Sequence, residues 1–241
     1  MHIIFIMSLK AIILAAGKGS RLGNLTKEMP KCLLEIPKIK MKIIDLQIKL
    51  LRKNKIKDIL VVTGFKSNKI KLHLKNKVRY RYYKNYNHSN NLMTMQSIKD
   101  EFNESFICIF SDLIFNEQIL KMLIKKKGNI IPAIDMTKSL PGTMRIKTYK
   151  KKLKDIGSHI QANKGDGNFI GMCKFSKKGS LLLKNELIKI KDNKKDYYTL
   201  AIRNLIKKKT FVDFLNIGNL FWQEIDNKID YIKLKKSFQK K

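Results

Sequence analysis

The sequence predicts a Rossmann-like α/β fold, in which a mostly parallel central sheet is flanked by helices. Short, continuously apolar segments alternate with segments of helical periodicity, and the links between them are short. Continuous apolar runs are typical of strands buried on both faces, and their alternation with helices is typical of parallel sheets. A hairpin-like segment at 143–156 adds a small β-rich insertion to the second half. We expect one domain over residues 1–241, with 1–8 as an N-terminal extension.

The first half of the chain supplies the parallel part of the sheet. In residues 42–53, Ile44, Ile48 and Leu51 recur at i, i+4 and i+7, which is the spacing of one helix face. The runs AIILAA and FICIF have no such period and are short enough for buried strands. We therefore expect the order strand, helix, strand, helix, strand, helix, strand over 11–16, 42–53, 59–63, 67–75, 78–83, 91–102 and 106–110.

The second half departs from this regular alternation. The segment TMRIKTY, a lysine-rich turn and LKDI together indicate a hairpin. Further strands are expected at 130–134, 169–175 and 211–215, and helices at 117–126, 178–190 and 196–207. No internal repeat and no Pro/Ser-rich linker interrupts the chain, which favours a single domain.

The strongly basic composition is ambiguous. Lys and Arg number 52 against 19 Asp and Glu, for a formal net charge of +33, and such a value often indicates a nucleic-acid or anionic-membrane partner. However, 46 of the 52 basic residues are lysine, the excess is spread along the chain, and the sequence holds 34 Ile and 19 Asn but only 6 Ala. We interpret most of the charge as compositional bias with a solvated lysine surface. Arg would be the better residue for binding phosphate.

Cysteine usage and hydropathy exclude several classes. Cys32, Cys108 and Cys173 are far apart, without a CxxC pair, so we expect buried thiols rather than a disulfide or a zinc site. No apolar run reaches the length of a membrane span. We expect a cytoplasmic protein without membrane insertion.

The strongest chemical signal is the loop after the first expected strand. Leu14-Ala15-Ala16 opens into GKGSRL, where glycines let backbone amides approach a polyphosphate and Arg21 adds a planar fork of donors. Lys31 follows ten residues later, after Pro30. The loop lacks the Walker pattern GxxxxGK[ST], and Leu22 stands where the dinucleotide pattern GxGxxG needs glycine. A plain strand-to-helix turn with incidental basic residues is the alternative.

These residues resemble a known family. The pattern LAAGxGxRL followed by Pro30-Lys31 is similar to the signature of nucleotidyltransferases that make activated sugars and phospho-alcohols. The length and the patterns NNxxT, FIG and WxEID resemble the short cytidylyltransferase branch, which activates phosphocholine, phosphonates or phosphorylated amides. The resemblance implies a nucleotide site with Arg21 and Lys31 as catalytic cations. The residues implied to contact the nucleotide are Leu14, Ala15, Ala16, Gly17, Gly19, Ser20, Arg21, Lys31 and Ser111.

Two aspartates are the candidate metal ligands. Asp112 follows a buried strand, and a carboxylate at the carboxyl end of a parallel strand faces the ligand crevice, where it can bind Mg²⁺. A strand-end cap is the alternative for this residue. Asp226 in WQEID is implied as the second Mg²⁺ ligand only by the resemblance, since from spacing alone a surface helix cap is equally acceptable. Glu224 is a weaker candidate near the metal.

Several further positions are expected around the substrates. Asn91 follows Asn90 at a helix start, where an N-cap is the ordinary role, and the resemblance implies that Asn91 and Thr94 line the pocket. Gly64 after ILVVT is expected to permit close approach of the base, unless it is a simple turn. The resemblance also places Asn168 and Gly171 at the acceptor, although the branch commonly has Glu at the position of Asn168. That difference disfavours a cationic acceptor.

Together these features predict an Mg²⁺-dependent enzyme that transfers CMP from CTP to a small phosphorylated or phosphonate acceptor and releases pyrophosphate. One alternative is a hexose-1-phosphate nucleotidyltransferase that makes a UDP-, GDP- or dTDP-sugar with the same loop. Another is a lysine-rich nucleic-acid-binding protein on an inactive fold. The set of two cations and two acids argues against the latter, and we expect no nucleic-acid partner. The sequence leaves the oligomeric state open.

Overall fold

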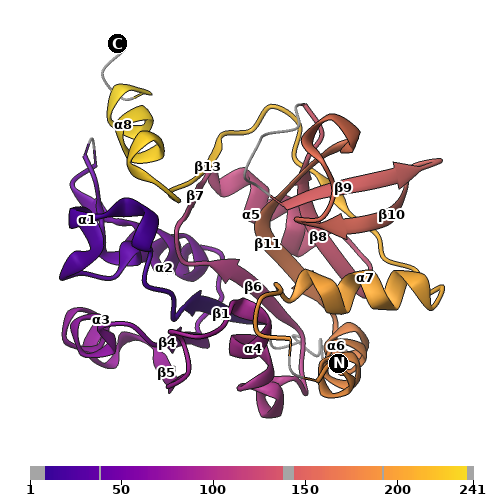
Figure 1. Cartoon of the computed structure of the whole chain (residues 1–241), viewed down its shortest axis with the longest axis horizontal. Coiled ribbons are helices and arrows are strands. Elements are labelled where there is room, and N and C mark those ends of the chain that lie inside the picture. Colours follow the sequence, from indigo (N-terminus) through magenta and orange to yellow (C-terminus); the bar gives the residue numbers. More distant parts are fainter. Residues whose placement is uncertain (1–8, 38, 138–143, 192, 238–241) are drawn as a thin grey trace, which may run out of the picture.

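The computed structural model describes residues 9–37, 39–137, 144–191 and 193–237, and the four strands expected in the first half form the parallel part of its main sheet (Figure 1). These strands are β1 (Lys10–Ala15), β4 (Ile59–Thr63), β5 (Arg79–Tyr82) and β6 (Phe106–Phe110). β1 pairs in parallel with β4 on one side and β6 on the other, and β5 extends the sheet beyond β4. The chain therefore reverses its direction of travel across the sheet at β1. Ligands bind at such a switch point, beyond the carboxyl ends of the strands.

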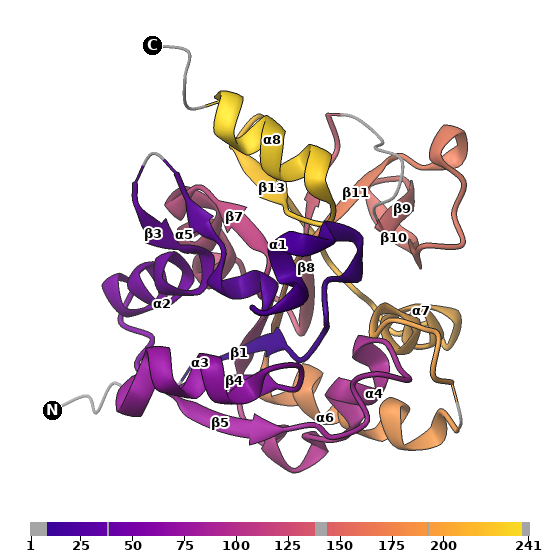
Figure 2. The same ribbon diagram turned by 60° about the vertical axis from the view of Figure 1, so that its left-hand side comes forward.

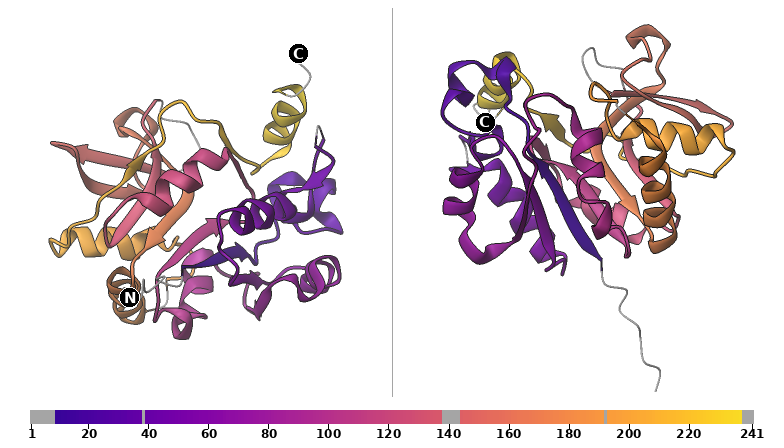
Figure 3. Two further views of the ribbon diagram at one scale, coloured as in Figure 1. Left: turned by 180° about the vertical axis from the view of Figure 1, so that it is seen from behind. Right: turned by 60° about the horizontal axis from the view of Figure 1, so that its bottom comes forward.

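The strands of the second half continue the sheet from β6. They are β8 (Ile130–Asp135), β9 (Met144–Tyr149), β10 (Lys152–Gly157), β11 (Gly167–Phe175) and β12 (Leu215–Asn216). β11 runs antiparallel to β6 and also pairs with β8 and β9, and β9 and β10 form the predicted hairpin. Figures 1 and 3 show this hairpin at the end of the molecule opposite β5. The prediction of a mostly parallel sheet with a small β insertion is confirmed.

Helices cover both faces of the sheet because residues of each strand alternate between them. Ala11 and Ile13 pack in one core with residues of α2 (Ile43–Lys53), α3 (Ser67–Leu74) and α5 (Glu117–Lys125). Ile12 and Leu14 pack in a second core with residues of α4 (Asn91–Gln96), α6 (Lys177–Lys189) and α7 (Thr199–Lys207). The result is a three-layer α/β arrangement. All three cysteines are buried free thiols, as expected.

Some elements differ from the sequence prediction. The helix expected over 91–102 is α4 followed by a separate 3₁₀ turn, Lys99–Glu101. Of the segment expected as a strand at 211–215, only Leu215 lies in a strand. Val212 lies in a loop and its side chain is buried in a core, whereas the side chain of Phe211 is 64% exposed. Elements without a sequence signal are α1 (Asn24–Lys27), β2 (Glu35–Ile36), β3 (Met41–Lys42), β7 (Leu113–Phe115), β13 (Trp222–Glu224) and α8 (Lys228–Ser237).

A third, smaller core joins the end of the chain to the glycine loop. Figure 2 shows α8 lying next to α1. Tyr231 and Leu234 of α8 pack with Leu22, Leu34 and other apolar residues of the first 50 positions. The hydroxyl of Tyr231 also donates a hydrogen bond to the carbonyl oxygen of Glu35 at 2.9 Å. Among the described residues, no helix is long and apolar enough to cross a membrane. One domain over the whole chain stays a prediction.

Lysine occupies unfavourable backbone positions at the ends of two helices. Among the described residues, every non-glycine residue with positive φ is a lysine, including Lys55 and Lys209. At Lys209 the amides of Lys209 and Thr210 donate to the carbonyls of Ile206 and Leu205, which is the Schellman pattern that normally ends in glycine. Lys55 ends α2 in the same pattern.

We expect Lys209→Gly to raise the free energy of unfolding by about 0.5–1 kcal/mol, because glycine adopts the left-handed conformation without the steric cost of a Cβ. Lys55→Gly is expected to have a similar effect. Urea denaturation measures both. Lys49→Gly, at an exposed position in the middle of α2, is the control and should lower stability by about 1 kcal/mol. A decrease in stability for Lys209→Gly would contradict the interpretation.

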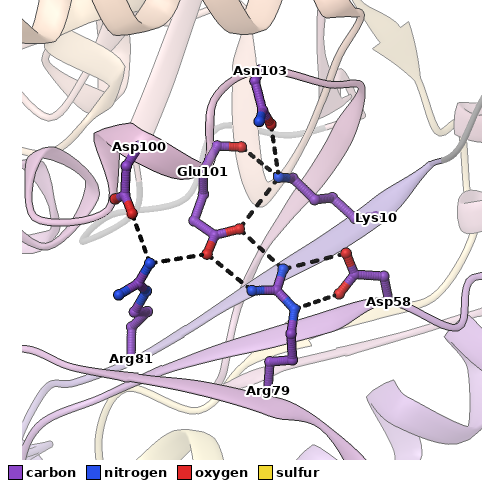
Figure 4. A network of polar contacts seen from close by, with 7 residues as sticks. All are labelled: Lys10, Asp58, Arg79, Arg81, Asp100, Glu101 and Asn103. Atoms are coloured by element: carbon purple, nitrogen blue, oxygen red, sulfur yellow. Dashed lines mark hydrogen bonds and ion pairs between the residues drawn. The ribbon is translucent and has the colours of Figure 1, made fainter.

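A network of charged residues joins the amino ends of the parallel strands, away from the edge where ligands are expected (Figure 4). Its centre is Glu101, whose side chain is 10% exposed. Arg79 donates to both carboxylate oxygens of Glu101 at 2.9 and 3.0 Å and to both of Asp58 at 2.9 and 3.2 Å. The buried ammonium of Lys10 also contacts Glu101. Hydrogen bonds from Arg79 hold the pKa of Glu101 at about 2, below its ordinary value.

We expect Glu101→Gln to lower the free energy of unfolding by about 2–3 kcal/mol at pH 7, because it leaves Lys10 and Arg79 with an uncharged partner. The lowered pKa means that the carboxylate stabilises the fold above about pH 4.5 and loses this effect as the pH falls toward 2. The difference in free energy of unfolding between the variant and the wild type should therefore be smaller at pH 3 than at pH 7. Asp100→Asn, at an exposed bond to Arg81, should change stability by less than about 1 kcal/mol. A constant difference across this pH range would refute the role of the Glu101 charge.

Candidate active site

A cavity of about 200 Å³ opens at the carboxyl ends of β1 and β6, where the switch point predicts a ligand site. Most of the residues predicted from the sequence line it. They are Leu14, Ala16, Gly17, Arg21, Lys31, Asn91, Thr94, Ser111, Asp112 and Asp226. The sheet thus brings together positions that lie more than 200 residues apart in the chain.

The glycine loop leaves β1 and supports Lys31. Residues 20–22 form a 3₁₀ turn, and the buried hydroxyl of Thr26 donates to the carbonyl oxygen of Gly19 at 2.8 Å. A Cβ at Gly19 would lie 3.3 Å from the Cβ of Lys31, so the loop packs closely along the lysine stem. This packing restricts the path of the Lys31 side chain to the cavity.

Four charged side chains meet at the floor of the cavity. The ammonium of Lys31 contacts Asp112 and lies 3.4 Å from Oδ1 of Asp226. Arg21 Nη2 lies 3.3 Å from the same oxygen of Asp226 and is largely exposed. Burial alone would lower the pKa of Lys31, but the carboxylates of Asp112 and Asp226 outweigh burial and raise it above the ordinary value. Lys31 therefore carries a full charge at neutral pH.

A third acid, Glu224, lies beside these residues and also lines the cavity. Burial raises its pKa well above the ordinary value, and the negative charges of Asp112 and Asp226 raise it further. β13 carries Glu224 and pairs with β7, and the register partner of Glu224 is Leu113, the residue directly after Asp112. The sequence pattern had given Glu224 only as a weaker candidate.

Asp226 is held by the start of α8 but does not cap it. The amides of Asp226 and Asn227 both donate to Oδ2 of Asp230 at 3.0 Å, and the amide of Asp230 donates back to Oδ1 of Asn227 at 3.0 Å. This reciprocal pair is a capping arrangement in which Asn227 and Asp230 satisfy the helix start. The side chain of Asp226 stays available to Lys31 and Arg21.

Gln47 fixes the turn that carries Asp112. This side chain on α2 is fully buried, and its amide nitrogen donates to the carbonyl oxygens of Phe110 and Leu113, each at 2.8 Å. These two carbonyls bracket Ser111 and Asp112. The Gln47 amide thus sets the position of the Asp112 carboxylate from behind the sheet edge.

We expect Gln47→Leu to lower kcat about 10- to 100-fold, because displacement of a reacting group by about 1 Å is enough for such a loss. The KM for nucleotide should change less, since Gln47 does not line the cavity. Gln96→Leu is a matched control: its amide nitrogen also bridges two carbonyl oxygens, of Leu187 and Ile190, each at 2.7 Å, but neither carbonyl flanks Asp112 and Gln96 does not line the cavity. Equal losses of stability with an unchanged kcat in both variants would limit Gln47 to a purely structural role.

The pair Asn90-Asn91 ties two walls of the cavity together. Asn90 occupies the N-cap position of α4, but its side chain makes no capping bond and donates instead to the carbonyl oxygen of Lys195. Oδ1 of Asn91 accepts a hydrogen bond from the amide of Tyr198 at 2.8 Å. The segment before α7 is thereby held against α4. Both asparagines line the cavity, as does Thr94, and their contact with a nucleotide stays a prediction.

Other predicted residues do not line the cavity. Ala15 packs in the core on the opposite face, and Ser20 lies in the 3₁₀ turn. A Cβ at Gly64 would lie 2.6 Å from the carbonyl oxygen of Ala16 and 2.8 Å from Tyr86, so glycine allows these two cavity residues to approach each other. Their roles toward a substrate stay predictions.

The two positions predicted for the acceptor also lie outside the cavity lining. Gly171 has φ of +81°, and a Cβ there would lie 2.8 Å from Phe110 and 3.1 Å from Oε1 of Glu224. It therefore supports Glu224 from behind. Asn168 is fully buried in β11, between its register partners Asp135 and Arg145.

Several cavity residues were not among the predicted site residues. They are Tyr86, Ser89, Phe110, Met144, Ser158 and Tyr197. The last three come from β9, the end of β10 and the segment before α7, which belong to the second half of the chain. No short motif marks them. The pairing of β11 with both β6 and β9 brings Met144 and Ser158 to the cavity, and the hydrogen bonds of Asn90 and Asn91 hold the segment of Tyr197 there.

The charged groups at the floor fit a magnesium ion. Among the described residues, no group of three or more His, Cys, Asp or Glu is arranged to hold a metal ion. Magnesium, however, is usually bound by only one or two carboxylates together with substrate phosphates and water. Asp112 and Asp226 both approach the Lys31 ammonium, so their oxygens already converge on a cation.

Comparisons with known proteins agree on one family. The model of a nucleotidyl transferase family matches residues 10–141. The CTP:phosphoglutamine cytidylyltransferase of Campylobacter jejuni is 28% identical over 90% of this chain and 96% of its own length. The choline-phosphate cytidylyltransferase of Streptococcus pneumoniae is 32% identical over 44% of this chain and 46% of its length. A solved CTP:phosphocholine cytidylyltransferase from the same species superposes with a TM-score of 0.78 at 20% identity, covering 96% of this chain and 99% of that one.

Proposed function

Because the chain belongs to the nucleotidyl transferase family, we propose that it is a cytidylyltransferase that transfers CMP from CTP to a small phosphorylated or phosphonate acceptor. The observation that carries this proposal is the group of Lys31, Arg21, Asp112 and Asp226 on the floor of one cavity. The choice of CTP is supported by the relative that matches 90% of the chain, which is named for that nucleotide.

The proposed reaction needs no general base. An oxygen of the acceptor phosphate, which is already an anion near neutral pH, attacks the α-phosphorus of CTP. The bond from that phosphorus to the oxygen that bridges to the β-phosphate breaks, and pyrophosphate leaves. Negative charge accumulates on the phosphoryl oxygens, and Lys31 and Arg21 stabilise it as fixed cations. The residues bind and align the two substrates, which is the main source of acceleration in such reactions.

Asp112 and Asp226 would hold a magnesium ion in this enzyme. When bound, magnesium neutralises charge on the triphosphate. The Lys31 ammonium, whose pKa is raised, keeps its proton throughout and acts as a charge rather than as an acid. Gln47 keeps Asp112 in place from behind.

Pyrophosphate release with four nucleoside triphosphates and a panel of acceptors tests the proposal. The panel contains phosphocholine, phosphoethanolamine, O-phosphoserine, 2-aminoethylphosphonate and glucose 1-phosphate, each with magnesium. We expect turnover with CTP and a phospho-alcohol, phospho-amino acid or phosphonate. Preference for UTP, GTP or dTTP with glucose 1-phosphate would identify a sugar nucleotidyltransferase instead. Salt-sensitive binding of RNA or DNA without pyrophosphate release would overturn the proposal.

A further inference from the structure

A second, smaller cavity of about 40 Å³ adjoins the first one. The two cavities share Ser158 and Tyr197 in their walls. The remaining walls come from the end of β10 with His159, and from the start of α7 with Arg203. The second cavity therefore lies next to the first across Ser158 and Tyr197.

The guanidinium of Arg203 is only partly satisfied by the protein. Its Nε is buried and has no hydrogen-bond partner among the described atoms. The nearest carboxylate oxygen, Oδ1 of Asp155, lies 3.8 Å from this Nε, which is beyond hydrogen-bond distance. The other oxygen of Asp155 is engaged by Nε2 of His159 at 2.8 Å. Nη1 of Arg203 lies 3.5 Å from Nδ1 of His159, which is a long contact, so the guanidinium that lines the cavity keeps donors for an anionic ligand.

The second cavity also contains a carboxylate without an ion-pair partner. Asp196 lines it, and Oδ2 of Asp196 accepts a hydrogen bond from the side-chain amide of Asn193. None of the ion pairs between described residues includes Asp196. The cavity thus offers one cation and one anion to a ligand.

We propose that the second cavity binds the end of the acceptor distal to its phosphate, and that this end is an amino-acid head with a carboxylate and an ammonium group. This inference rests on the proposed cytidylyltransferase function. Arg203 binds the carboxylate, because a planar guanidinium matches two carboxylate oxygens. Asp196 binds the ammonium group. Ser158 and Tyr197, which line both cavities, lie between the head and the phosphate.

The lining disfavours a quaternary ammonium head. Such groups are bound by cages of several aromatic rings. The second cavity has a single aromatic residue, Tyr197, and a quaternary ammonium head would leave the guanidinium of Arg203 without an anionic partner. A phosphorylated amino acid satisfies both charges of the cavity at once.

Matched acceptors test this charge requirement. O-phosphoserine and O-phosphohomoserine carry both head groups at two chain lengths, whereas phosphoethanolamine and 3-aminopropyl phosphate lack only the carboxylate. With CTP and magnesium, we expect kcat/KM to be at least about tenfold higher for the better phospho-amino acid than for its amine counterpart. Arg203→Met should remove this preference by raising KM for the phospho-amino acid, while the amine counterpart is unaffected. Asp196→Asn should weaken both acceptors, since both carry the ammonium group.

Controls separate this role from folding and from the proposed function. Arg52→Met removes an arginine on α2 that does not line either cavity, and it should leave acceptor preference unchanged. The KM for CTP should stay constant in all three variants. Equal kcat/KM for the matched acceptors, or equal losses for both in Arg203→Met, would overturn the inference while the cytidylyltransferase function stands. If no acceptor of any kind is converted with CTP, the proposed function fails and this inference fails with it.

Discussion

Lys31→Gln is expected to lower kcat by about 10³-fold, because a fixed cation that stabilises charge on the phosphoryl group is removed from a water-poor site. Glutamine keeps much of the length of lysine and can still donate a hydrogen bond to Asp112. The loss therefore reports the charge more than the packing. Steady-state pyrophosphate release with saturating CTP and acceptor measures it.

The stability of the Lys31 variant must be followed together with its rate. Lys31 lies between Asp112 and Asp226, and its removal leaves these carboxylates and Glu224 near one another without a buried cation. Thermal unfolding and the KM for CTP show whether the site is still formed. Lys27→Gln, at an exposed lysine of α1, is the control and should keep wild-type turnover. A Lys31→Gln enzyme with near wild-type kcat would exclude Lys31 from catalysis.

The sequence was most informative where function and local structure coincide. The glycine loop and Asp112 follow strands of the parallel sheet, and such strands carry long apolar runs that are recognisable without a structure. The switch point at β1 then brings the loop and Asp112 together. This part of the candidate site could be predicted because its geometry follows from the strand order alone.

The rest of the site depends on contacts that leave no periodic pattern. β7 and β13 have three residues each and pair across more than a hundred positions, which is too short for a recognisable alternation. α8 also lacks a clear apolar stripe, since Tyr231 and Leu234 are buried while Ile229 and Ile232 are exposed. β13 carries Glu224, and the start of α8 holds Asp226. The sequence could suggest their role only through family resemblance.

Lysine content is a poor guide to function in this chain. Lysines occupy the left-handed positions at the ends of α2 and α7, where glycine or asparagine fits better. Residues in such positions follow composition rather than local need. In contrast, Lys31 is defined by its neighbours, since Gly19 packs along its stem and two carboxylates approach its ammonium. The chemical environment of a lysine, and not its abundance, marks the candidate site.

Asp112→Asn is expected to lower kcat by about 10²–10³-fold and to raise the magnesium concentration needed for half-maximal rate. Asparagine keeps the shape of the side chain but loses the negative charge that binds a hard cation. Asp226→Asn should show the same magnesium shift with a smaller loss, because Asp226 is more exposed, at 22% against 7% for the Asp112 side chain. Initial rates over a magnesium titration measure both effects.

The double variant tests whether the two aspartates act on one ion. If they share a single magnesium, the loss in Asp112→Asn with Asp226→Asn together is smaller than the product of the single losses, because the second change removes a ligand from a site that is already disrupted. Asp213→Asn, in an ion pair with Lys126 outside both cavities, is the control and should leave the magnesium dependence unchanged. Independent, multiplicative losses would mean that the two carboxylates act separately. Full activity of wild type in the presence of a chelator would rule out a metal at this site.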